Sequence, residues 1–142
     1  MNQYYIYLSS DYCKDIFRSN SVSDFTNKLD PPIELNNIED WSVALTEISY
    51  PPGTKQSFSL YTDVITTSYG MGNQLPILRN VNVDSQKSNI IFDRPYYIKI
   101  NNNFLEQLRV YIRGLNGESL SFNTGTLSCV LHLRRSTPWY ES

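Results

Sequence analysis

The stretch SDFTNKLDPPIELNNIEDWSVALTEISYPPG, residues 23–53, decides the fold, because it holds strand and turn signals and no catalytic motif. Its best strand pattern is WSVALTEISY (41–50), in which every second residue from Trp41 to position 45 is apolar and shares one face. The apolar positions then change parity, which predicts a β-bulge near Thr46-Glu47. Pro51-Pro52-Gly53 ends the strand in a turn.

The residues before this strand are extended as well. DFTNKL (24–29) reads as a strand, but Asp30-Pro31-Pro32 follows it and cannot continue a central ladder, because proline has no backbone N–H to donate. The preceding segment, 11–23, is polar and irregular, with at most one helical turn around Ile16-Phe17.

Short alternating segments recur along the rest of the chain, with turn residues at intervals of roughly 8–12 positions. This pattern is typical of an all-β sandwich or barrel. One short helix is expected in NFLEQL, because Asn103 and Glu106 have the spacing of a helix N-cap and its third residue. The expected strands cover residues 3–9, 24–29, 41–50, 58–65, 75–83, 88–93, 95–100, 108–114, 119–122 and 126–135.

Length and composition predict one globular domain. A chain of 142 residues can bury roughly 68% of its unfolded surface, so residues 1–142 are expected to form a single domain with a C-terminal tail at 136–142. The net charge of -2 argues against a protein that binds nucleic acid over its whole surface. Only Cys13 and Cys129 are present, so reduced thiols are expected.

The N-terminus has no signal-peptide pattern, no apolar run is long enough to span a membrane, and no N-glycosylation sequon occurs. These observations predict synthesis in the cytoplasm or nucleus.

The sequence offers little that resembles an active site. The single histidine, His132, lies on the parity opposite the apolar face 127–133 and is expected to be an ordinary strand histidine. One histidine and two distant cysteines do not supply a zinc site. The Gly-x-Gly in YGMGN (69–73) is followed by no helix, so it fails as a phosphate loop. We therefore expect no catalytic residues, no metal and no cofactor.

Arginines and aromatic residues are the stronger signals. Arg109, Arg113, Arg134 and Arg135 fall on the last two long strands and are expected either as solvated side chains or as one basic patch facing an acidic partner or packaged nucleic acid. The 11 tyrosines favour a sheet protein that makes contacts. Residues 3–9 are apolar or aromatic on both faces, which predicts contact with another layer or another chain. The candidates for such contacts are Tyr5, Tyr7, Tyr111, Trp139 and Tyr140.

The tail supplies two of these candidates. Trp139 and Tyr140 follow the last strand, and docking on the same domain and docking on a neighbour remain equally open.

The motif YIYLSS…SNS…DFTNKLDPPIEL…WSVALTEISYPPG, with LRVYIRG and VLHLRR near the C-terminus, resembles the minor capsid (penton-like) proteins of Polinton (Maverick) elements and adintoviruses. The resemblance covers most of residues 3–60 and 96–135. It implies a single jelly-roll β-sandwich that acts as a structural protein of a virion. It also implies that Trp41 anchors the core and that the tyrosines cover surfaces between subunits.

The same resemblance implies a symmetric homo-oligomer, a pentamer or alternatively a trimer, that meets a major capsid protein and contacts packaged DNA. A second hypothesis is a receptor- or glycan-binding attachment module with a lectin-like sandwich, whose site would lie on loops 66–74 and 114–118. An enzyme is a distant third hypothesis.

Overall fold

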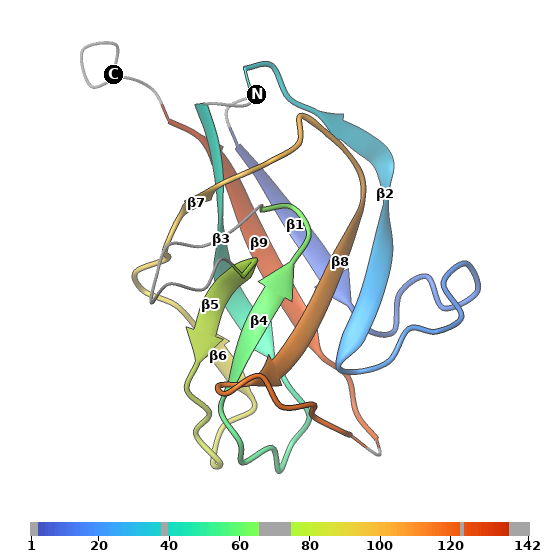
Figure 1. Ribbon diagram of the computed structural model, residues 1–142, viewed down its shortest axis with the longest axis vertical. Coiled ribbons are helices and arrows are strands. Elements are labelled where there is room, and N and C mark those ends of the chain that lie inside the picture. Colours follow the sequence, from blue (N-terminus) through green and yellow to red (C-terminus); the bar gives the residue numbers. More distant parts are fainter. Residues whose placement is uncertain (1–2, 38–39, 66–74, 123, 137–142) are drawn as a thin grey trace.

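The computed structural model describes residues 3–37, 40–65, 75–122 and 124–136. These residues form two antiparallel sheets packed face to face, with no α-helix among them (Figure 1). The nine strands are β1 (Gln3–Ser9), β2 (Asp24–Glu34), β3 (Trp41–Ser49), β4 (Phe58–Thr62), β5 (Ile77–Val81), β6 (Asn89–Ile91), β7 (Ile98–Lys99), β8 (Phe104–Gly114) and β9 (Ser128–Arg135).

The strand order is that of a jelly roll. The five-stranded sheet has the order β1-β9-β3-β6, with β7 also pairing β3, and the four-stranded sheet has the order β2-β8-β4-β5. Because β6 and β7 pair with opposite ends of β3, they act as two parts of one interrupted strand. Counted this way, the first strand pairs with the last, the second with the next to last, and so on inward, which is an eight-stranded double-sheet jelly roll. The predicted β-sandwich is therefore confirmed.

The core lies between the sheets and follows the alternation of the strands. In β9, Cys129, Leu131 and Leu133 are buried and point inward, and β8 buries every second residue from Leu108 onward. Trp41 is 3% exposed, and its indole N–H donates a hydrogen bond to the backbone oxygen of Asn36. The indole is therefore buried in the core, and its N–H group has a hydrogen-bond acceptor.

The central strand β3 contains the predicted bulge. Its register with β9 shifts between Leu45 and Glu47. The hydroxyl of Thr46 donates a hydrogen bond of 3.0 Å to the backbone oxygen of Val130, across the irregularity. Ile48 consequently returns to the core, where it is fully buried.

Strand β2 lies at the edge of the four-stranded sheet and passes through the two prolines. Its register with β8 shifts between Lys28 and Ile33, the segment that contains Pro31-Pro32. The prediction that these prolines do not continue a central ladder is confirmed.

Two predicted elements are wrong. The segment expected to form a helix, NFLEQL, is the start of β8, where Leu105 pairs with Ile33 and is 3% exposed. Strand pairing and burial thus outweigh the local cap-like spacing of Asn103 and Glu106. Residues 119–122 form no strand either; they belong to the connection between β8 and β9.

The irregular segment 11–23 is a series of turns. The backbone N–H groups of Ile16 and Phe17 both donate to the backbone oxygen of Cys13, which forms the single turn expected there. No helix of the described residues is long and apolar enough to cross a membrane.

Asn27, which is 2% exposed, joins the two sheets beside this segment. Its side-chain oxygen accepts from Ser9 N at 2.8 Å, and its side-chain nitrogen donates to Ser9 O at 3.0 Å. We call this arrangement the Asn27 clamp. It gives the end of β1 hydrogen bonds in place of a neighbouring strand.

Candidate functional site

The outer face of the five-stranded sheet carries a cluster around His132. The Tyr5 ring stacks on the imidazole, with centroids 4.5 Å apart and planes inclined by 14°. The Tyr97 hydroxyl lies 2.6 Å from Nδ1, and Gln3 Oε1 lies 2.8 Å from Nε2. Arg134 covers the Tyr97 ring, with its guanidinium carbon 3.5 Å from the centroid. The histidine thus points away from the core, as predicted, but under a cover of neighbouring side chains.

The surroundings of His132 favour its neutral form. An amide oxygen can only accept, so Nε2 donates to Gln3 Oε1, and in the neutral imidazole Nδ1 accepts from the Tyr97 hydroxyl. Burial lowers the pKa of His132, and the positive charge of Arg134 lowers it further. Both ring nitrogens of the neutral imidazole are therefore occupied, which suits a structural role and leaves neither free to take a proton from a substrate.

Tyr5 and Tyr7 are the most prominent groups beside this cluster. Their exposed fractions are 54% and 66%, and both belong to β1, whose only ladder partner among the described residues is β9. The N–H and C=O of Ser9 point away from β9, to the Asn27 clamp. Backbone groups two residues apart point the same way, so those of Tyr5 and Tyr7 face the open side of β1. This strand presents exposed rings and an unpaired edge together.

Tyr111 lies on the opposite side of the molecule, on the outer face of the four-stranded sheet. Its ring stacks on that of Tyr61 at 4.7 Å, and the guanidinium carbon of Arg109 lies 4.4 Å from its centroid. Arg109 in turn donates two hydrogen bonds to Asp24, of 2.9 and 2.7 Å, and this carboxylate raises the pKa of the guanidinium. Tyr111 therefore belongs to a polar face, separate from that of Tyr5 and Tyr7.

Of the two alternatives for the four arginines, solvated side chains or one basic patch, the structure does not support the single patch. Arg109 and Arg113 lie on β8 in one sheet, whereas Arg134 and Arg135 lie on β9 in the other. The side chains of Arg109 and Arg113 face out from the four-stranded sheet, and Arg134 shares the outer face of His132 on the opposite sheet. Arg135 pairs with Asp40 at 3.4 Å.

The predicted tail contacts, Trp139 and Tyr140, and the loop 66–74 lie outside the described residues. The other predicted loop, 114–118, is a turn in which Gly114 N donates to Glu118 O and Gly117 N donates to Gly114 O.

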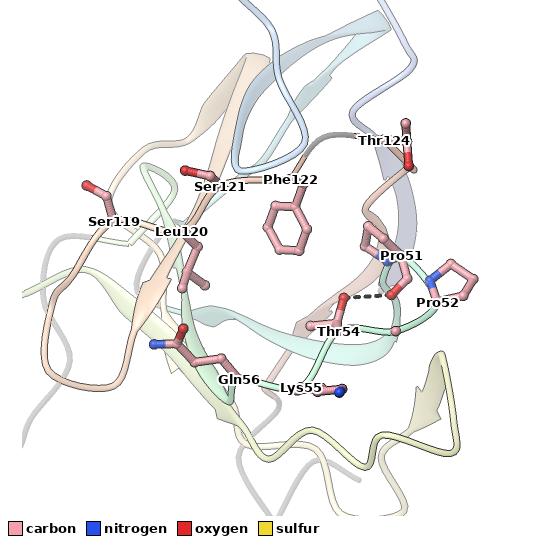
Figure 2. Close-up of a pocket in the computed structure, with 11 residues that line it drawn as sticks. Pro51, Pro52, Thr54, Lys55, Gln56, Ser119, Leu120, Ser121, Phe122 and Thr124 are labelled. Carbon is pink, nitrogen blue, oxygen red and sulfur yellow. Dashed lines mark hydrogen bonds between the residues drawn. The ribbon is translucent and has the colours of Figure 1, made fainter.

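A pocket of about 450 Å³ lies next to this turn, between the loop 51–56 and the connection 119–124 (Figure 2). Figure 2 shows the Phe122 ring and the Leu120 side chain between the two segments, with Gln56 on the opposite wall. Serine and threonine hydroxyls from both segments also line the pocket. The wall is thus partly apolar and partly polar.

Among the described residues there is no group of three or more metal-ligating side chains. Burial raises the pKa of Cys129 to about 12, so this thiol stays protonated. Burial also raises the pKa of Asp63, whose carboxylate accepts from the backbone N–H of Arg109 at 3.0 Å.

Sequence reasoning missed the residues that organise these surfaces. Asn27 is an asparagine within a strand pattern, where this residue type is uncommon, and that anomaly was a usable signal. Tyr97 is 35 residues from His132, and no local pattern links them. Arg79, on the edge strand β5, also gave no signal in the sequence.

Comparison with known proteins gave no match to a family model and no match to a curated protein.

Proposed function

We propose that this protein is a structural component of a virion, a minor capsid protein of the penton-like kind that its sequence resembles. The fold is compatible with this proposal. Double-sheet jelly rolls are used by viral capsid proteins, although lectins and cupins share them. Since a fold alone does not give a function, the surface must decide between these classes.

The observation that carries the proposal is the exposure of Tyr5 and Tyr7 on an open edge strand. Proteins usually protect such an edge with charges, prolines or a covering segment, because it can pair with another chain. Here the edge carries large aromatic rings, which are enriched where proteins meet and depleted on free surfaces. A protein whose function is to bind other protein subunits would account for exposed aromatic rings on an open edge strand.

In this proposal the partner across β1 is a second copy, within a pentamer or alternatively a trimer, and the assembly meets a major capsid protein. The protein would be made in the host cytoplasm or nucleus and incorporated in the virion. Contact with packaged DNA would use arginines without a carboxylate partner, which favours Arg113 and Arg134 over the ion-paired Arg109 and Arg135.

The test is the solution mass from light scattering over a concentration series. We expect a defined oligomer, and we expect Tyr5→Ser with Tyr7→Ser to weaken association by at least tenfold, a larger effect than on the folding stability of the monomer. Tyr12→Ser is the matched control, because Tyr12 is 52% exposed but lies in the irregular segment outside β1. A monomer at the highest concentration, or an equal effect of the control, would count against assembly through β1.

A second candidate function is a receptor- or glycan-binding attachment module. The pocket between the loop 51–56 and the connection 119–124 favours it, because an aromatic ring beside hydroxyl and amide groups suits a sugar. The site would then lie beside the turn 114–118. Saturable binding on a glycan array, lost in Phe122→Leu and retained in Tyr12→Ser, would support this candidate. The absence of binding on a broad array would remove it.

A further inference from the structure

A second groove, of about 360 Å³, lies along β5, the edge strand of the four-stranded sheet. One wall is β5 itself, and the other comes from the segment that leads into β7, with Tyr96 and Ile98. The groove therefore lies where an edge of one sheet meets an edge of the other, at the side away from β1 and β2.

Arg79 is held rigidly in this groove. Its guanidinium carbon lies 3.9 Å above the centre of the Phe92 ring, and its Nη1 donates a hydrogen bond of 3.1 Å to the backbone oxygen of Arg94. These two contacts fix the plane of the guanidinium. They leave further N–H donors of the fork without a partner in the described chain.

Within the part of the chain that the structure describes, Arg79 forms no ion pair with a carboxylate. Burial alone lowers its pKa, whereas Asp24 raises that of Arg109. Arg94, which also lines the groove, is exposed and forms no ion pair with a described carboxylate. Arg79 and Arg94 thus line one groove, and neither forms an ion pair with a carboxylate of the described residues.

The remaining walls suit an extended peptide. Asn80 accepts a hydrogen bond of 2.6 Å from the Ser59 hydroxyl through its side-chain oxygen, so its amide nitrogen is left to donate. Tyr96 is 65% exposed, and Ile77 and Ile98 give apolar surface beside the cations. In the described residues β5 pairs only with β4, which leaves its other edge open to a strand.

We propose that this groove binds an extended acidic segment of another protein, which adds a strand to β5 and places an Asp or Glu carboxylate against Arg79. The planar fork of Arg79 matches a carboxylate with two parallel hydrogen bonds. Apolar side chains next to the carboxylate would lie on Tyr96 and Ile98. An isolated phosphate would leave these apolar walls uncovered, so a peptide fits the groove better. The inference stands apart from assembly through β1.

The probe is an immobilised array of peptides of the form Thr-Val-Z-Val-Z-Val-Thr, in which Z is Glu, Asp, Gln, Lys or phosphoserine. We expect the Glu and Asp peptides to bind at least tenfold more tightly than the Gln peptides, and Arg79→Gln to remove this preference. Arg113→Gln is the matched control, because Arg113 is an exposed arginine on the same sheet but lies on its outer face. It should bind as the wild type does.

Equal binding of Glu and Gln peptides, absence of binding, or an acidic preference that survives in Arg79→Gln would overturn the proposal. Tighter binding of the phosphoserine peptides than of the Glu peptides would overturn the assignment to a carboxylate. If Arg79→Gln unfolds because the contact with Phe92 is lost, Arg94→Gln tests the same charge at an exposed position, where at least a threefold loss is expected. Light scattering of each variant separates this site from assembly, because oligomer formation should not change.

Discussion

Gly125 packs directly against Pro51: a β-carbon built on Gly125 would lie 2.6 Å from Cβ of Pro51. The contact joins the connection between β8 and β9 to the turn that ends β3. Gly125 also has a φ of +108°, a conformation that residues with a side chain rarely adopt. The proline-rich turn thus has a specific partner that is distant in the sequence.

Gly125→Ala is expected to reduce the free energy of unfolding by about 2–4 kcal/mol, because strain and a steric clash act together. Gly117→Ala is the matched control, since Gly117 has a φ of +86° and nothing within 4 Å of a built β-carbon. Gly117→Ala should reduce the free energy of unfolding by about 1 kcal/mol, because only backbone strain acts there. Urea unfolding measures both, and equal losses would show that the contact with Pro51 is unimportant.

Asn27→Ala is expected to destabilise the protein by about 2–4 kcal/mol, because it leaves the buried N–H and C=O of Ser9 without partners. Asn20 makes similar bonds with the backbone of Thr26, but at a less buried site, so Asn20→Ala should cost about 1 kcal/mol. Thermal and urea unfolding of the two variants compare them. If Asn20→Ala reduced the free energy of unfolding more than Asn27→Ala did, burial would not determine how much the Asn27 clamp stabilises the protein.

The two thiols should differ in reactivity. Cys129 is buried and its pKa is raised to about 12, so in the native protein it should react with a disulfide reagent at least a hundredfold more slowly than Cys13. Titration should therefore show one prompt thiol, and the second only on unfolding. Cys13→Ser should abolish the prompt reaction; its persistence in that variant would contradict the burial of Cys129.

Stability should fall as the pH drops from 7.5 to 5.5. The native state lowers the pKa of His132 from its ordinary value of 6.5, so below that value the unfolded chain binds a proton that the native state resists. Above it both states are neutral and the effect vanishes. His132 is the single histidine, so His132→Gln should flatten this slope in a series of Tm measurements. An unchanged slope in His132→Gln would show that other titratable groups cause the dependence of Tm on pH.

The sequence was most informative where local pattern and tertiary structure agree. In β3, the change of parity after Leu45 predicted the bulge that the register with β9 contains. It misled at Asn103, where the spacing of a helix cap occurs by chance at the start of a strand. The pairing of Leu105 with Ile33, some 70 positions away, decides that segment and leaves no local trace.

The candidate surfaces were harder to predict than the fold. Strand alternation placed Tyr5 and Tyr7 on one face of their strand, but their exposure and their separation from Tyr111 depend on which sheet each strand joins. The same holds for the arginines of β8 and β9, which are consecutive strands and yet face opposite sides of the sandwich. Alternation in the sequence shows which side chains of a strand share a face. The order of the strands in the two sheets determines which other side chains lie beside that face.

The position of β9 between β1 and β3 has a consequence for biosynthesis. Until residues 128–135 leave the ribosome, β1 has no ladder partner. The five-stranded sheet then lacks the strand that joins β1 to β3. Most contacts of this sheet are distant in sequence, which slows folding. The nascent chain should therefore remain sensitive to protease until its last strand is made, and a premature stop before Ser128 should yield an aggregating product and not a smaller domain.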